Sequence, residues 1–144
     1  MRTSPPRLVL GLMSAERAVR RWVDGRSGDS GIGAAGAGVL FHLAAHDGAL
    51  VGEVTAALNA SAAGTSGLVN RLAAAGLLRK TPDPADARAV RLSLTPRGRE
   101  VEAAARSILA ELNELLVDGF TPEELATVAR WLARTTELSR LAAR

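Results

Sequence analysis

The fold is decided by residues 61–98, which read SAAGTSGLVNRLAAAGLLRKTPDPADARAVRLSLTPRG. The first part of this stretch has the apolar spacing of an amphipathic helix. Ser61 can cap such a helix by accepting hydrogen bonds from amides two or three residues later, and Gly76 is a typical C-terminal stop. We therefore predict a helix from Ser61 to Ala75. Its predicted buried edge consists of Leu68, Val69 and Leu72.

The second part of the stretch changes to the period of two that is typical of β-strands. Residues 77–81 can form one strand, and in a second strand the apolar residues Val90, Leu92 and Leu94 alternate with polar ones. Residues 82–88 between the strands are turn formers and charged residues, which are typical of a hairpin tip. The stretch therefore predicts a helix followed by a β-wing.

Helices are predicted on both sides of this stretch. A short helix at residues 51–58 is joined to the 61–75 helix by a tight corner at residues 59–60, and the two form a helix-turn-helix unit. The residues of the short helix expected to face inward are Val54, Ala57 and Leu58. Further helices are expected at residues 8–25, 34–46, 96–118 and 122–138, the last of them opened by a capping box in Thr121-Pro122-Glu123-Glu124.

The chain is thus predicted to be mainly α with a small β-wing, a winged helix-turn-helix with helices at both termini. We expect a single domain over residues 1–144. Within it, residues 1–47 hold the N-terminal helices, residues 48–95 the winged helix-turn-helix and residues 96–144 the C-terminal helices.

The charge distribution indicates a polyanionic partner. The net charge is +3, but residues 71–99 carry seven basic residues against Asp83 and Asp86, a local balance of +5, so the remainder sums to −2. Such clustering suits a nucleic acid, and a solvated basic face without a partner is the alternative. The seven basic residues are Arg71, Arg79, Lys80, Arg88, Arg91, Arg97 and Arg99.

Several classes of protein are excluded by what the sequence lacks. It has no cysteine, which excludes disulfides, thiolate metal sites and thiol redox switches. No apolar run approaches the roughly 20 residues that span a bilayer, and charged residues follow Leu8–Met13 too soon for a secretory signal. Neither Ser61 nor Ser66 has a neighbouring histidine in the sequence, and residues 31–38 lack the lysine of a phosphate loop. We expect a cytoplasmic protein without catalytic activity, cofactor or membrane partner.

The outer helices predict a homodimer. The first helix and the last two each carry an apolar stripe outside the winged region, and one small winged domain cannot cover three such stripes. Mutual burial across a two-fold axis is one solution, and an intrachain bundle is the other. A dimer would place two recognition helices about 34 Å apart, one helical turn of DNA.

The sequence resembles the MarR family in successive blocks. The most specific block is Asp86-Ala87-Arg88 followed by Leu94-Thr95-Pro96-Arg97-Gly98, which resembles the wing signature of that family. Residues 39–40, 48–54, 61–72 and 76–80 are similar to earlier blocks, in the same order. The resemblance implies a homodimeric regulator of transcription, usually a repressor, that is often relieved by a small aromatic or phenolic molecule.

The resemblance also implies how such a protein would bind the pseudo-palindromic operator in double-stranded DNA. The 61–75 helix would enter the major groove, and Arg88, supported by Asp86, would reach the minor groove. Because the helix has no basic residue before Arg71, base reading would rest on Ser61, Thr65, Ser66 and Asn70, with Asn70 able to pair bidentately with adenine. Phosphate contacts are expected from Arg71, Lys80 and Arg91, alongside Arg79.

A second hypothesis concerns an effector pocket. His42 and His46 share a helix face, and His42 could orient an acidic or phenolic ligand, with His46, Trp22 and Phe41 beside it. Core packing or plain exposure is the alternative for each of these residues. We predict no metal site, because two histidines are the whole supply of the chain.

Two further functional hypotheses stay open at this stage. One is a DNA-binding protein of the same fold that responds to no effector. The other is a protein-interaction module that has lost DNA binding, for which the weakly basic recognition helix is the support.

Overall fold

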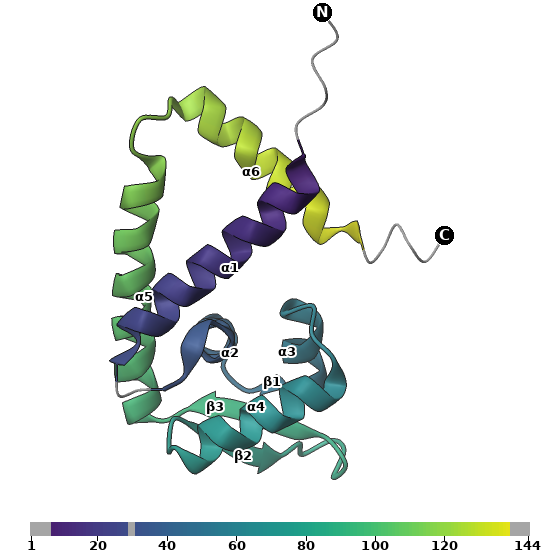
Figure 1. Cartoon of the computed structure of the whole chain (residues 1–144). Helices are drawn as coiled ribbons and strands as arrows, with labels where there is room; N and C mark the ends of the chain where they lie inside the picture. Colours follow the sequence, from purple (N-terminus) through teal and green to yellow (C-terminus); the bar gives the residue numbers. More distant parts are fainter. Residues whose placement is uncertain (1–6, 29–30, 139–144) are drawn as a thin grey trace, which may run out of the picture. The chain divides into compact units, whose positions relative to one another are not determined.

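The computed structural model describes residues 7–28 and 31–138, and the chain divides into two compact units, residues 1–109 and 110–144 (Figure 1). The described helices are α1 (Leu8–Arg26), α2 (Gly33–Ala45), α3 (Val51–Ala57), α4 (Ala62–Ala74), α5 (Pro96–Val117) and α6 (Pro122–Thr136). The strands are β1 (Ala49–Leu50), β2 (Leu78–Pro82) and β3 (Val90–Leu94). This architecture confirms the predicted fold class. Among the described helices, none combines the length and the apolar character that a membrane crossing requires.

The helix-turn-helix consists of α3 and α4. Asn59 between them has a φ of 50°, a left-handed conformation that asparagine adopts more readily than most residues, and this produces the predicted corner. The Oγ of Ser61 accepts a hydrogen bond from the backbone N of Gly64 at 3.0 Å, which confirms the predicted N-cap. Ala57 was expected to face inward and is exposed instead, because the seven-residue α3 packs only its edge around Val54.

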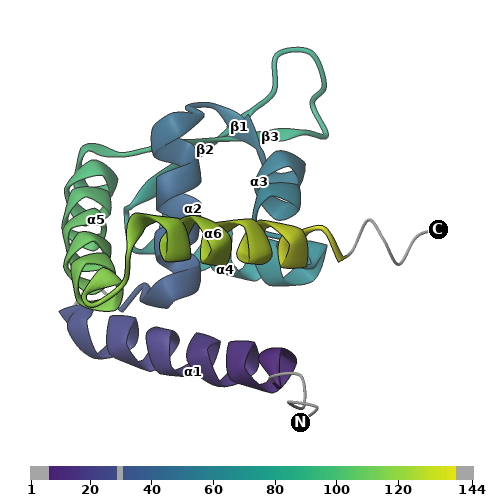
Figure 2. The same ribbon diagram turned by 90° about the horizontal axis from the view of Figure 1, so that it is seen from above.

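The wing is part of a three-stranded antiparallel sheet in the order β1-β3-β2. Lys80 of β2 lies opposite Leu92 of β3, and Pro82 lies opposite Val90. The sequence pattern contained no signal for β1, because its two residues are too few to show a period of two. Figure 2 shows the loop between β2 and β3 extending away from the helices of its unit.

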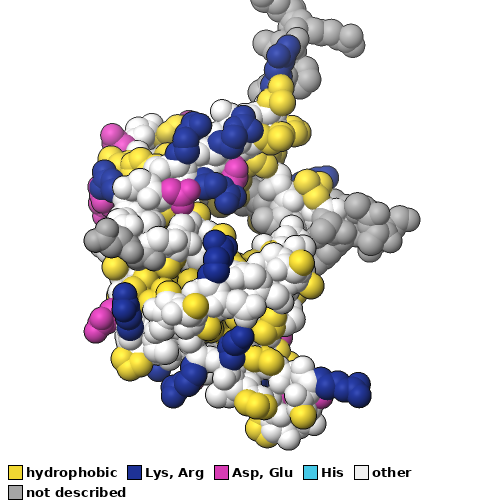
Figure 3. Space-filling view, turned by 60° about the horizontal axis from the view of Figure 1, so that its bottom comes forward, with side chains coloured by type: hydrophobic (Ala, Val, Ile, Leu, Met, Phe, Trp, Pro, Cys, Tyr) yellow, Lys and Arg dark blue, Asp and Glu magenta, His cyan; other side chains and the backbone are white. Residues whose placement is uncertain are grey.

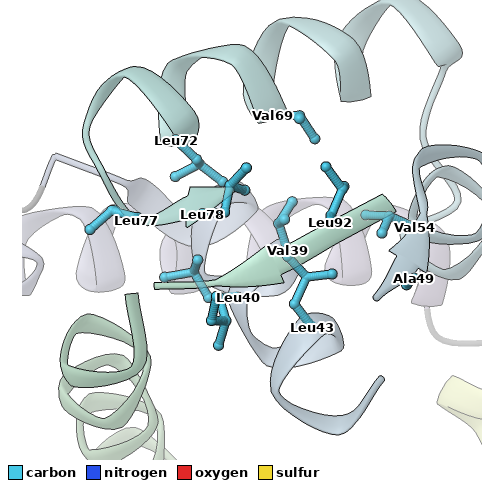
Figure 4. Packing of buried hydrophobic residues seen from close by; sticks show 11 residues of the cluster. Val39, Leu40, Leu43, Ala49, Val54, Val69, Leu72, Leu77, Leu78 and Leu92 are labelled. Carbon is cyan, nitrogen blue, oxygen red and sulfur yellow. The ribbon is translucent and has the colours of Figure 1, made fainter. Parts of the chain in front are cut away.

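The core of the first unit lies where the sheet meets α2, α3 and α4 (Figure 4). The central strand contributes Leu92, which is fully buried, and α2 contributes Leu40 and Leu43. Burying an aliphatic side chain of this size contributes about 1.5–3 kcal/mol, so these contacts fix the helix-turn-helix to the wing. The cluster consists of Val39, Leu40, Leu43, Ala49, Val54, Val69, Leu72, Leu77, Leu78, Leu92 and Leu94.

A close junction joins the end of α4, the wing and the start of α5. The hydroxyl of Thr95 donates to the carbonyl of Gly76 at 2.6 Å and accepts from the backbone N of Gly98 at 2.9 Å. The backbone N of Thr95 donates to the carbonyl of Leu77 at 3.1 Å. A Cβ atom on Gly98 would lie 1.8 Å from the Leu77 oxygen, so only glycine fits there.

The second unit has little core of its own. Leu112 is the one buried residue among those described in residues 110–138. Thr121 and Glu124 form the predicted capping box at α6, with hydrogen bonds of 3.2 and 2.9 Å between side chain and backbone. The exposed large apolar residues of this unit are Leu115, Leu116, Phe120, Val128, Leu132 and Leu138.

Helix α1 of the first unit also exposes apolar residues. Val23 is its buried residue, and its exposed large apolar residues are Leu8, Val9, Leu10 and Met13. Such clusters of exposed apolar side chains are typical of surfaces that another chain covers.

The Gly98→Ala variant is expected to lower the free energy of unfolding by about 1–3 kcal/mol, because its methyl group overlaps the Leu77 carbonyl. Gly67→Ala is the matched control, since it too replaces a helical glycine and a Cβ there meets nothing within 4 Å. The control is expected to gain up to about 1 kcal/mol from helix propensity. Urea denaturation of both variants at equal protein concentration measures the difference, and equal midpoints would contradict the close contact.

Candidate nucleic-acid interface

The exposed side of α4 carries most of the predicted base-reading residues. Ser61, Ser66, Asn70 and Arg71 are exposed. Thr65 was predicted to read a base, but this prediction is wrong. Thr65 is only 1% exposed, and its hydroxyl donates to the carbonyl of Ser61 at 3.0 Å. Thr65 precedes the buried Val69 and Leu72 by four and seven residues, which places it on the same edge of the helix. It belongs to the core and presents nothing to a base.

Asn70 is linked to the wing. The Nζ of Lys80 on β2 donates a hydrogen bond to the Oδ1 of Asn70 at 2.8 Å, and both side chains are exposed. Two residues that were predicted to contact DNA separately, one at a base and one at a phosphate, therefore form a single polar group at the end of α4.

The tip of the wing is organised by Asp86. Its Oδ1 accepts from the backbone N of Arg88 at 2.9 Å, and its carbonyl accepts from the backbone N of Ala89 at 2.9 Å. Asp86 therefore shapes the turn through the backbone of Arg88. Arg88 itself is exposed, at the end of a hairpin that extends from the body of its unit (Figure 2).

Arg91 has a structural role that the sequence did not reveal. Its Nε donates to the Oδ1 of Asp83, and its Nη1 donates to the carbonyl of Gly48, each at 2.9 Å. The Asp83 side chain is 8% exposed, so Arg91 compensates a nearly buried carboxylate and ties the wing to the residue before β1. Arg91 is thus a brace within the wing, and because 42% of its side chain is exposed, its phosphate contact stays a prediction. Only the eight-residue separation across the hairpin could have suggested the Asp83 pairing.

The charges on this side of the molecule favour a polyanion. Helix α4 and strand β2 contain no acidic residue, and Asp83 is neutralised by Arg91. Figure 3 shows Lys and Arg side chains spread over the side that holds α4 and the wing, with fewer Asp and Glu side chains among them. Exposed cations in this arrangement suit the phosphates of a nucleic acid backbone.

A pocket of about 420 Å³ lies beside α4 within the first unit. Arg20 of α1 and Arg71 of α4 line it together with Ala34, Ala35 and Leu68. The Nε of Arg20 donates to Glu16 at 2.8 Å, and this hydrogen bond raises the pKa of the guanidinium above its ordinary value. No sequence pattern indicated this pocket, because its residues come from α1, α2, α4 and the corner between α3 and α4.

The four residues predicted for an effector pocket do not line it, and each has another contact. The guanidinium of Arg26 lies 4.4 Å from the ring centre of Trp22, and that of Arg106 lies 5.2 Å from the ring centre of Phe41. His42 and His46 stack with ring centres 4.5 Å apart. In the described part of the chain, no three His, Cys, Asp or Glu side chains form a group that could hold a metal ion.

The helix-turn-helix, the three-stranded sheet and the protruding arginine tip define a winged helix-turn-helix protein of the DNA-binding class. The family model described as "MarR family" matches residues 30–89, which include the helix-turn-helix and most of the wing. Residues 30–89 are therefore similar to the MarR family, and a solved MarR family transcription regulator, SP03579, is 26% identical to the chain, with 95% of this chain and 91% of that chain covered and a TM-score of 0.82.

Solved structures share this fold over nearly the whole chain. Bordetella bronchiseptica BpsR is 25% identical, with 92% of this chain and 94% of that chain covered and a TM-score of 0.83. Streptomyces coelicolor PcaV is 21% identical, with 96% and 99% covered and a TM-score of 0.82. A mutant MarR from E. coli, solved with operator DNA, is 21% identical, with 89% and 92% covered and a TM-score of 0.80. No curated protein sequence matches the chain significantly.

Arg91→Ala is expected to lower the free energy of unfolding by about 1–3 kcal/mol, because it leaves the Asp83 carboxylate nearly buried without its cation. Arg79→Ala is the matched control, since Arg79 is exposed on the neighbouring strand. Its effect should stay within about 0.5 kcal/mol. Chemical denaturation without DNA measures the structural role of Arg91 separately from any contact with a phosphate. If both variants are as stable as the wild type, Arg91 does not stabilise the wing.

Proposed function

We propose that the protein is a homodimeric repressor that binds a pseudo-palindromic operator, with α4 in the major groove and Arg88 in the minor groove. The observation that carries this proposal is the position of Ser66, Asn70 and Arg71 on the exposed side of α4, combined with Arg88 at the wing tip. The small residues Ala63 and Gly67 on the same side would let the helix backbone approach the base edges closely.

The exposed apolar residues of α1 and of the second unit support the homodimer. Removing apolar surface from water contributes roughly 25 cal/mol per Å², so a second copy that covers these residues would stabilise both chains. Two copies related by a two-fold axis would bind two half-sites about 34 Å apart. A dimer on such a site would compete with the transcription machinery, which is the physical basis of repression.

Arg88→Ala is expected to weaken DNA binding at least about tenfold at moderate salt, because it removes the minor-groove side chain and leaves the Asp86 turn intact. The measurement is fluorescence anisotropy with duplex DNA from upstream of the gene. Arg79→Ala, which also removes one exposed cation, should lose less affinity. Equal losses would mean that Arg88 contributes charge alone.

The same samples test the dimer. Sedimentation equilibrium without DNA should give twice the mass of one 15.0 kDa chain for the wild type and for Arg88→Ala alike. A mass of one chain for a folded wild type that still binds the duplex would contradict the dimer.

The pocket beside α4 supports relief of repression by a small aromatic anion. Arg20, whose Nε also donates to Glu16, and Arg71 line a space that is otherwise bordered mainly by small and apolar residues. Guanidinium groups bind carboxylates through paired hydrogen bonds. Because Arg71 also belongs to the exposed side of α4, a carboxylate in the pocket would compete with a DNA phosphate for this side chain. The DNA binding of the similar BpsR is regulated by 6-hydroxynicotinic acid, and PcaV was solved with its natural ligand.

A panel of hydroxylated aromatic acids, 6-hydroxynicotinic acid among them, should include a compound that raises the unfolding temperature. A ligand at one hundred times its Kd adds about 2.7 kcal/mol to the stability of the folded state. Arg20→Gln should abolish the shift, and Arg21→Gln, which changes an exposed neighbour outside the pocket, should keep it. If no compound shifts the wild type or releases its DNA, the hypothesis of a regulator without an effector holds.

A further inference from the structure

The hydrogen bond between Lys80 and Asn70 determines which atoms of Asn70 are available to a base. An ammonium group has three donors and no acceptor, so a carboxamide that contacts it must present its oxygen. The Nζ–Oδ1 distance of 2.8 Å therefore fixes the amide orientation chemically, and the NH₂ group of Asn70 points away from Lys80.

The two elements that carry this pair contribute no competing anion. Neither α4 nor β2 has an acidic residue, and Asp83, the first acidic residue after β2, is bound by Arg91. Lys80 is held on a strand whose register against β3 is defined by five pairs, and Asn70 is held on a capped helix. The pair thus joins the recognition helix to the wing and exposes N–H donors from both of its members.

Because one lone pair of Oδ1 already accepts from Lys80, the pair presents a donor-rich edge that suits adenine less well than a free asparagine does. Bidentate pairing with adenine requires Oδ1 to accept from the N6 amino group while Nδ2 donates to N7. With Lys80 on one lone pair of Oδ1, the adenine amino group would have to use the second lone pair beside the ammonium charge, so two donors would lie next to each other. Guanine presents two acceptors, N7 and O6, at the same edge of the major groove. Two acceptors match the donors that Asn70 and Lys80 have left.

We propose that Lys80 determines base specificity by holding Asn70 as a hydrogen-bond donor, so that this group selects guanine where a free asparagine would select adenine. The inference rests on the proposed function, because it assumes that α4 enters the major groove. It replaces the expectation, drawn from the sequence, that Asn70 pairs with adenine. Lys80 becomes a specificity residue rather than a phosphate contact alone.

The test is selection of bound duplexes from a random library with the full-length protein. The wild type should enrich a motif with one guanine per half-site that disappears in Asn70→Ala. Lys80→Met keeps the aliphatic stem and removes the donors, and should replace that guanine by adenine while the rest of the motif stays the same. Lys80→Arg, which keeps a cationic donor, should retain guanine. Arg79→Met is the control for loss of one cation on the same strand and should weaken binding without changing the motif.

Anisotropy with two synthetic duplexes that differ only at this base pair then measures the preference. The wild type should favour guanine roughly tenfold, the lower range for one bidentate contact, and Lys80→Met should reverse the sign. An adenine in the wild-type motif would contradict the role of Lys80 in base specificity, and so would a motif that neither Asn70→Ala nor Lys80→Met changes. Either result would leave the proposed DNA-binding function intact. If the wild type enriches no duplex at all, both this inference and the proposed function fail.

Discussion

The contact between Gly98 and the carbonyl of Leu77 is the constraint on which the arrangement of the DNA-binding elements depends. It brings the first turn of α5 against the chain that leaves α4, at a distance that no side chain permits. Thr95 adds hydrogen bonds to Gly76 and Leu77 across the same junction. Because α4, the wing and α5 all meet there, the orientation of the recognition helix and the direction of the hairpin are set together.

The basic residues of this region differ in what they are able to do. Arg91 is committed to Asp83 and Gly48, and Lys80 is committed in part to Asn70. Arg88 is exposed, with Asp86 bonded to its backbone and not to its guanidinium. Of the seven basic residues in residues 71–99, Arg91 and Lys80 are thus partly engaged within the protein. The base specificity that we infer comes from Lys80, because its hydrogen bond to Asn70 decides which polar atoms of Asn70 a base meets.

Arg71 connects the two functions proposed for the first unit. It lies on the exposed side of α4 and also lines the pocket that Arg20 of α1 borders. A ligand at this pocket would need no long-range change to affect DNA binding, because it would compete for a guanidinium on the recognition helix itself. The coupling free energy would then be the interaction that Arg71 gives up at one ligand when it binds the other.

Much of the fold followed from the sequence alone, because it depends on local interactions. The caps at Ser61 and Thr121, the corner at Asn59 and the alternation around Leu92 each act within a few residues, and each was predicted correctly. The wing motif likewise indicated the similarity to the MarR family, because its residues lie close together in the chain. The two-residue β1 escaped prediction because it is paired only through tertiary structure.

Tertiary structure alone decided which polar residues face outward and which are bound within the protein. Thr65 is buried because α4 is oriented so that Thr65, Val69 and Leu72 form its inner edge. The sequence did not predict this burial, because threonine is polar and does not extend the apolar pattern of the helix. The pairs Arg91–Asp83 and Lys80–Asn70 join residues eight and ten apart, on elements whose register no local pattern specifies. Local propensity determines where helices and strands begin and end, whereas the partners of a long, flexible side chain depend on how those elements pack.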